Sequence, residues 1–82
     1  MDKASLVSAL SYLMQEKRRL ISELNERIED LEMKRKSIET HILDRIPPAL
    51  YPDVQNYIAY INTEKEMLEK HKETVEKWNL SG

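Results

Sequence analysis

The sequence of 82 residues contains no cysteine and only one glycine. Without cysteine the chain can form no disulfide, and thiolate ligands or a cysteine nucleophile are excluded. Three prolines are present, and they gather in one short stretch, residues 47–52. A single glycine, combined with many Leu, Glu, Lys and Arg residues, is the composition of long exposed helices or coiled coils.

Long apolar runs and a strong net charge are also missing. No stretch approaches the roughly 18 apolar residues that would span a bilayer. Residues 4–14 are fairly apolar, but serines interrupt them and no small-residue cleavage site follows, so no signal peptide is expected. The net charge of -2 argues against a polyanion as the main partner. We expect a soluble intracellular protein, cytoplasmic by default, with the nucleus left open.

The first predicted helix covers residues 3–45, a segment without glycine or proline. Its apolar side chains recur with a heptad period, which is typical of a long helix with one packed stripe. The a positions are Val7, Met14, Ile21, Ile28, Arg35 and Ile42, and the d positions are Leu10, Lys17, Leu24, Leu31, Ile38 and Arg45. The stripe predicts a neighbouring helix along this face.

The prolines predict a turn over residues 46–52 and a second helix over residues 53–79. The predicted stripe of this second helix is Val54, Tyr57, Ile61, Glu64, Leu68, His71, Val75 and Trp78. The fold class is therefore all-α: an antiparallel two-helix hairpin of the coiled-coil kind, forming one domain over residues 1–82. A core this thin predicts association into a dimeric or higher helical bundle.

Folding the chain back at the turn sets which residues face each other. With Ile46 opposite Asp53, Arg35 faces Glu64, so the charged residue in the middle of each stripe meets the other. Sliding the helices by one heptad would strand these charges against unsuitable neighbours. Arg35 and Glu64 are therefore predicted to be an ion pair that fixes the register.

The same count leaves the first helix longer than the second. Residues 4–17, called the N-terminal arm here, have no predicted partner within the chain, although their apolar stripe is the widest. The predicted interface residues are Leu6, Val7, Leu10, Leu13, Met14 and Leu20. An exposed apolar face of this size usually marks an interface. The partner is a second copy or the helices of another protein, and self-association is the commoner solution.

No residue cluster predicts catalysis, a cofactor or a metal site. His41 and His71, the two histidines, fall on different levels of the predicted hairpin. The main prediction is a non-enzymatic structural or adaptor protein that assembles through its arm. One alternative is a dimeric nucleic-acid-binding protein, and another is a small inhibitor that docks a helix face onto an enzyme. The basic stripe of the first alternative is Arg18, Arg19, Lys34 and Lys36.

Overall fold

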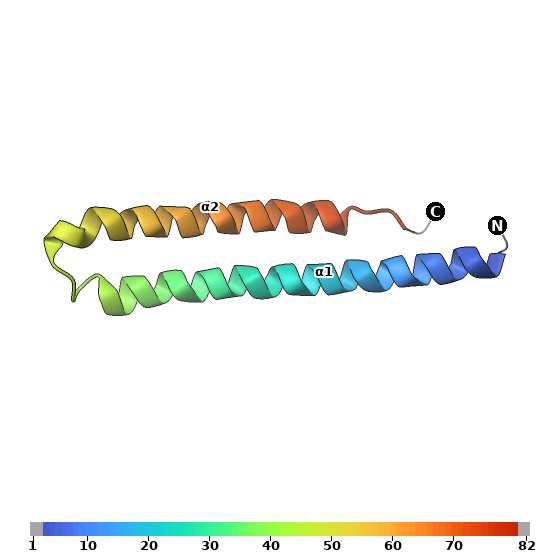
Figure 1. Ribbon diagram of the computed structural model, residues 1–82, viewed down its shortest axis with the longest axis horizontal. Helices are drawn as coiled ribbons and strands as arrows, with labels where there is room; N and C mark the ends of the chain where they lie inside the picture. Colours follow the sequence, from blue (N-terminus) through green and yellow to red (C-terminus); the bar gives the residue numbers. More distant parts are fainter. Residues whose placement is uncertain (1–2, 81–82) are drawn as a thin grey trace.

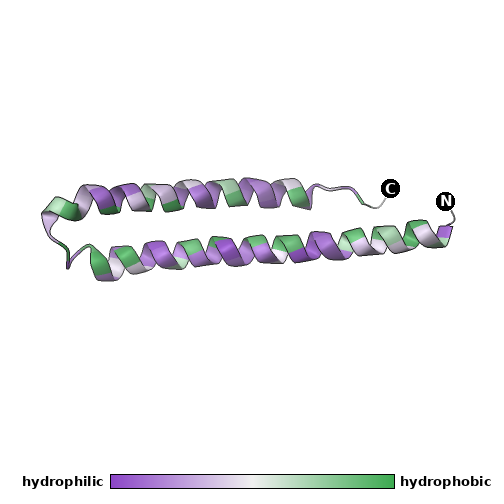
Figure 2. Cartoon of the chain, in the orientation of Figure 1, coloured by the Kyte–Doolittle hydropathy of each residue, from purple (hydrophilic) through white to green (hydrophobic). Residues whose placement is uncertain are grey.

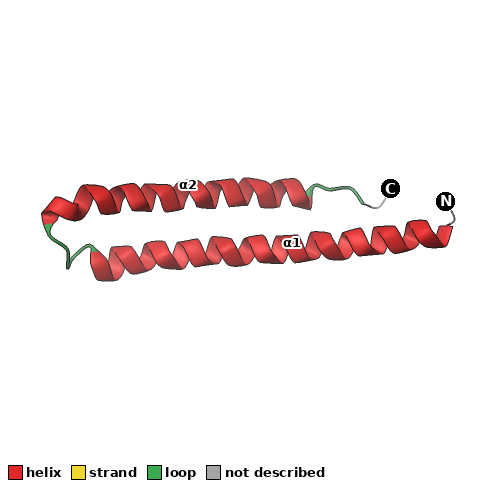
Figure 3. Cartoon of the chain, in the orientation of Figure 1, coloured by secondary structure: helices red, strands yellow, loops and turns green. Residues whose placement is uncertain are grey.

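The computed structural model describes residues 3–80 and shows two long helices that run antiparallel, side by side (Figure 1). Helix α1 spans Lys3–Ser37 and helix α2 spans Tyr51–Glu76. A π-helical turn, Ile38–Ile42, continues α1, and a short 3₁₀ turn, Pro48–Leu50, leads into α2. Helices and turns account for all the regular structure of residues 3–80 (Figure 3). The hairpin measures 67 × 16 × 13 Å.

The prolines shape the turn through their own geometry. Pro47 is extended, with φ -60° and ψ 144°, because the residue before a proline is pushed out of the helical region. Pro52 lies in the first turn of α2, where its missing amide hydrogen has no helical acceptor to serve. Helix α2 therefore begins at Tyr51, two residues before the predicted start. It ends at Glu76, so Trp78 lies beyond the helix and not on its stripe.

The end of the first helix also differs from the prediction of an α-helix to residue 45. The α-helical pattern stops at Ser37, and the Leu43 amide donates to the Ile38 carbonyl over five residues, at 3.1 Å. A π-helical turn holds one extra residue, which rotates everything after it by about one position. Consequently Leu43 packs on the core and Ile42, the predicted a-position residue, is left 40% exposed.

The core lies between the two helices and is concentrated near the turn. Ile38 from α1's π-helical end packs with Ile58 and Ile61 from α2. Leu31, Leu43 and Val54 pack around this cluster. Leu24 and Val75 are also buried, farther from the turn. Hydrophobic residues (green) lie mainly along the facing edges of the two helices, and hydrophilic residues (purple) cover much of the rest (Figure 2).

The stripe of α2 alternates differently from the predicted one. Ile58 is buried whereas its neighbour Tyr57 is 49% exposed. The observed stripe is Val54, Ile58, Ile61, Lys65, Leu68, Lys72 and Val75. Both stripes have heptad spacing, so periodicity alone does not choose between them. Burying Ile58 leaves no polar atom unpaired, whereas the Tyr57 hydroxyl would need a partner, and lysine stems can flank a seam while their charges reach water.

The extra residue in the π-helical turn gives a testable prediction. Deleting exposed Thr40 should convert the turn to α-helix and keep Leu43 on the core, so the free energy of unfolding should change by no more than about 1 kcal/mol. Deleting exposed Arg27 should instead rotate Leu24 out of the core and cost roughly 2–5 kcal/mol. Urea unfolding followed by circular dichroism measures both. Equal losses for the two deletions would contradict the role given to the turn.

Candidate functional site

The N-terminal arm presents the largest set of exposed apolar side chains on α1. In Figure 1, α1 extends well past the end of α2. The exposed fractions in the arm are 48% for Leu6, 62% for Val7, 44% for Leu13 and 42% for Met14. Leu10 and Leu20, the other predicted interface residues, are half-buried. Four of the six predicted interface residues are therefore exposed on the part of α1 that extends past α2.

The chain after α2 covers part of what was predicted to be open. Residues 77–80, which follow α2, are called the tail or C-terminal tail here. The Lys17 ammonium group donates to the Trp78 carbonyl at 3.0 Å, and this hydrogen bond holds the tail against α1. Tail and helix enclose a shallow hollow of about 280 Å³, lined by Met14, Lys17, Arg18, Ile21, Trp78, Asn79 and Leu80. Among the described residues, α2 and the tail thus leave the apolar side chains of residues 6–13 largely uncovered, a shorter stretch than the predicted 4–17.

The predicted ion pair between Arg35 and Glu64 is replaced by others. The Arg35 guanidinium contacts Glu32 at 3.2 Å and Glu39 at 3.5 Å, both on its own helix. Across the helices, the ion pair recorded within residues 3–80 joins Lys65 to Glu32. The observed and predicted stripes of α2 share Val54, Ile61, Leu68 and Val75, but every position between them moves one residue later. Lys65 therefore takes the place next to α1 that had been assigned to Glu64.

The charge of Lys65 acts on the titration of Glu32. The hydrogen bond and the positive charge of Lys65 lower the pKa of the Glu32 carboxyl, and Arg35 lowers it further. Partial burial opposes this shift, but the pKa remains below its ordinary value of 4.5. Glu32 is therefore ionised at neutral pH, and its carboxylate is shared by Lys65, Arg35 and Lys36.

Local acids partner most of the basic residues singled out for nucleic-acid binding. The pairs are Arg19–Glu16 at 2.6 Å, Lys34–Asp30 at 3.1 Å and Lys36–Glu32 at 4.0 Å. Asp30 also raises the pKa of Lys34. Arg18 lies apart from these pairs, at the tail hollow. Each paired cation would have to give up a carboxylate before it could neutralise a phosphate, which weakens the case for a basic stripe.

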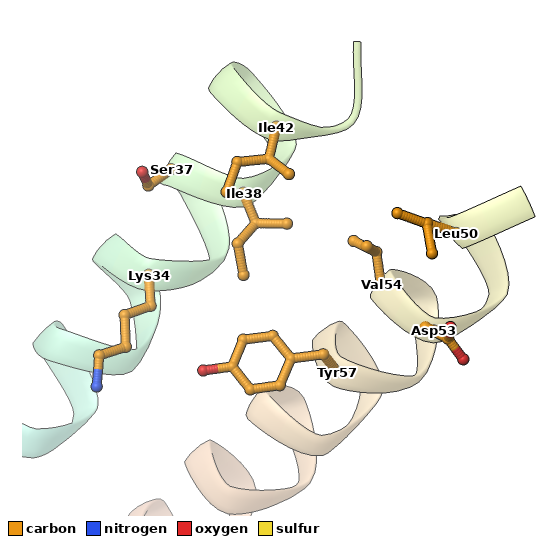
Figure 4. A pocket seen from close by; sticks show the side chains of 8 residues that line it. All are labelled: Lys34, Ser37, Ile38, Ile42, Leu50, Asp53, Val54 and Tyr57. Carbon is orange, nitrogen blue, oxygen red and sulfur yellow. The ribbon is translucent and has the colours of Figure 1, made fainter. Parts of the chain in front are cut away.

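An apolar cleft of about 570 Å³ opens near the turn, and the sequence did not predict it. Figure 4 shows Tyr57 and Leu50 facing the end of α1 across the cleft. Its lining consists of Lys34, Ser37, Ile38, Ile42, Leu50, Asp53, Val54 and Tyr57. The cleft exists because Ile42 and Tyr57 lie beside the packed seam and not inside it. The π-helical turn places Ile42 there, and the burial of Ile58 leaves Tyr57 at the edge of α2. The sequence signal was the aromatic and apolar group around the prolines.

The described residues, 3–80, contain no group of three or more histidine, aspartate or glutamate side chains placed to hold a metal ion. None of the helices within that range is long and apolar enough to cross a membrane. No family model, curated protein or solved structure matches the chain. Function is therefore inferred from the molecule's own surfaces.

The position of Glu32 predicts a pH dependence. Its lowered pKa means that the unfolded carboxyl, titrating near 4.5, binds the proton more tightly than the folded one. The stabilisation is present above that value and is lost as the pH falls through the folded pKa. Glu32→Gln should therefore lower the melting temperature at pH 7, and its difference from the parent protein should shrink at pH 3.

Glu64→Gln is the matched control for this experiment, because the ion pairs recorded within residues 3–80 do not include Glu64. It should change the melting temperature less than Glu32→Gln at pH 7. Circular dichroism melts at the two pH values measure both variants. If Glu64→Gln is the more damaging substitution, the register with Arg35 opposite Glu64 is correct and the pairing described above is wrong.

Proposed function

We propose that this chain is a non-enzymatic structural or adaptor protein that assembles through its N-terminal arm, and that the arm's partner is a second copy of the chain. The observation that carries the proposal is the apolar face formed by Leu6, Val7, Leu10 and Leu13, which lies beyond α2 and beyond the tail as far as the structure describes it, to Leu80. A helix with an apolar stripe is stable in water when another element covers that stripe. Within residues 3–80, no second helix covers this face of the arm.

Burying this face would contribute a substantial part of the free energy that association needs. Fully burying a large apolar side chain contributes about 1.5–3 kcal/mol. Leu6, Val7, Leu13 and Met14 are each about half exposed, so covering them contributes roughly 3–6 kcal/mol for each copy. Part of this gain offsets the lost translational and rotational freedom of two molecules. The expected complex is a reversible dimer whose population falls on dilution.

The other candidate functions have less support. A nucleic-acid-binding protein needs cations that are free to meet phosphates, and Arg19, Lys34 and Lys36 each have a carboxylate within 4.0 Å on their own helix. An inhibitor of an enzyme would use the same apolar arm, and so would an adaptor that binds another protein's helices. Both of these alternatives predict that the purified protein is a monomer, so the mass measurement below distinguishes them from self-association.

Placing charges in the arm should abolish the dimer. Leu10→Asp combined with Leu13→Asp puts two carboxylates on the proposed contact, where burying them without partners is unfavourable. Light scattering over a series of concentrations should then give the mass of one chain, compared with twice that mass for the parent protein. Circular dichroism should show that the helices of the hairpin remain.

The control uses exposed apolar residues elsewhere on the hairpin. Met33 is 68% exposed and Met67 is 60% exposed, and both lie outside the arm. Met33→Asp combined with Met67→Asp should leave the mass of the dimer unchanged. A parent protein that stays monomeric at high concentration, or an arm variant with the same mass as the parent, would refute self-assembly through the arm.

A further inference from the structure

We infer that the two copies join antiparallel through their arms, with a two-fold axis beside Leu10. The inference rests on the proposed function and adds the geometry of the contact. In this arrangement α1 of each copy packs against the arm of the other copy, in the position that a longer α2 would have filled. The first turn of one copy then reaches the C-terminal tail of the other.

The spacing of the apolar residues in the arm is symmetric about Leu10. Counting outward in both directions, apolar side chains stand three and four residues away, and a lysine stands seven residues away. The set is Lys3, Leu6, Val7, Leu10, Leu13, Met14 and Lys17. On a helix, positions three, four and seven residues apart share one face. This face is therefore centred on Leu10 and bounded by a cation at each end.

A face with this symmetry is complementary to a second copy of itself. A two-fold axis produces an isologous contact, in which residue i meets residue j and j meets i. With Leu10 at the axis, Leu6 meets Met14 of the second copy and Val7 meets Leu13. Each of the five apolar side chains of this face then meets an apolar side chain of the other copy, and the two lysines fall at the edges of the contact, where their charges remain in water.

The position of α2 favours the antiparallel direction. The arm's face continues directly into the stripe of α1 that packs toward α2, which includes Leu24, Leu31 and Ile38. A second α1 running parallel on the same face would meet α2 and the tail beyond Lys17. An antiparallel α1 ends there instead, because its Lys3 lies opposite Lys17.

The helix dipoles favour this direction, and they oppose the repulsion between Lys3 and Lys17 of the second copy. The first turn of α1 contains no acidic residue, and the last turn of α2 contains no basic residue. The positive end of one helix dipole would approach the negative end of another, which is favourable. The hollow of about 280 Å³ between α1 and the tail opens at this meeting point, and Met14, which lines it, is still 42% exposed.

Cysteine cross-linking tests the geometry, because the natural chain contains no cysteine to interfere. Leu6→Cys and Met14→Cys proteins are mixed and oxidised. The mixture should yield a cross-linked dimer, whereas either variant alone should yield far less. In the antiparallel contact two copies of residue 6 lie about 12 Å apart along the helix, too far for a disulfide with its usual 4.4–6.8 Å between Cα atoms.

A second pair and a control complete the experiment. Val7→Cys mixed with Leu13→Cys should give the same result as the first pair, and exposed Met33→Cys should not cross-link in any mixture. If the parent protein is a dimer but Leu6→Cys cross-links with itself, or if neither mixed pair cross-links, the antiparallel geometry is wrong and arm-mediated assembly still stands. A monomeric parent protein would instead overturn the proposed function, and the geometry with it.

Discussion

The apolar seam between α1 and α2 determines the rest of this structure. What matters most is that the seam ends before the apolar stripe of α1 does. The turn that contains the prolines stands past the middle of the chain, so α2 is shorter than its partner. At the open end of the hairpin, the Lys17 ammonium group donates to the Trp78 carbonyl, and Met14 lies beside the tail. Before Met14 the apolar stripe of α1 continues beyond the end of α2, with Leu6, Val7 and Leu13 exposed. An exposed interaction surface is therefore a direct consequence of where the turn lies.

Details near the turn follow from how the seam closes. The π-helical turn brings Leu43 onto the core formed by Ile38, Ile58 and Ile61, and the displaced Ile42 becomes part of a cleft. Farther along, the half-buried ion pair of Lys65 with Glu32 occupies the seam between apolar layers. Polar groups inside a seam are often associated with a defined register, and this pair is placed to serve that purpose here.

The sequence predicted the helical composition, the two helices and the α1 stripe from Lys17 to Ile38, because heptad spacing and prolines are strong signals. It did not predict the π-helical turn, since one extra residue leaves no trace in the periodicity of so short a segment. The choice of Ile58 over Tyr57 was missed because both fit a heptad. The error in the Arg35–Glu64 pair followed from that choice. The packing of the tail beside Met14 was also missed, because it depends on tertiary contacts of Trp78 that the spacing of residues in the sequence does not reveal.

Small-angle X-ray scattering of the parent protein tests self-assembly through the arm most directly, because it gives mass and length together. Two hairpins 67 Å long that overlap by about 21 Å form a particle about 113 Å long. The account predicts this length, with twice the mass of one chain, at concentrations where the dimer is populated. A particle near 67 Å long with the mass of one chain at every concentration would contradict it.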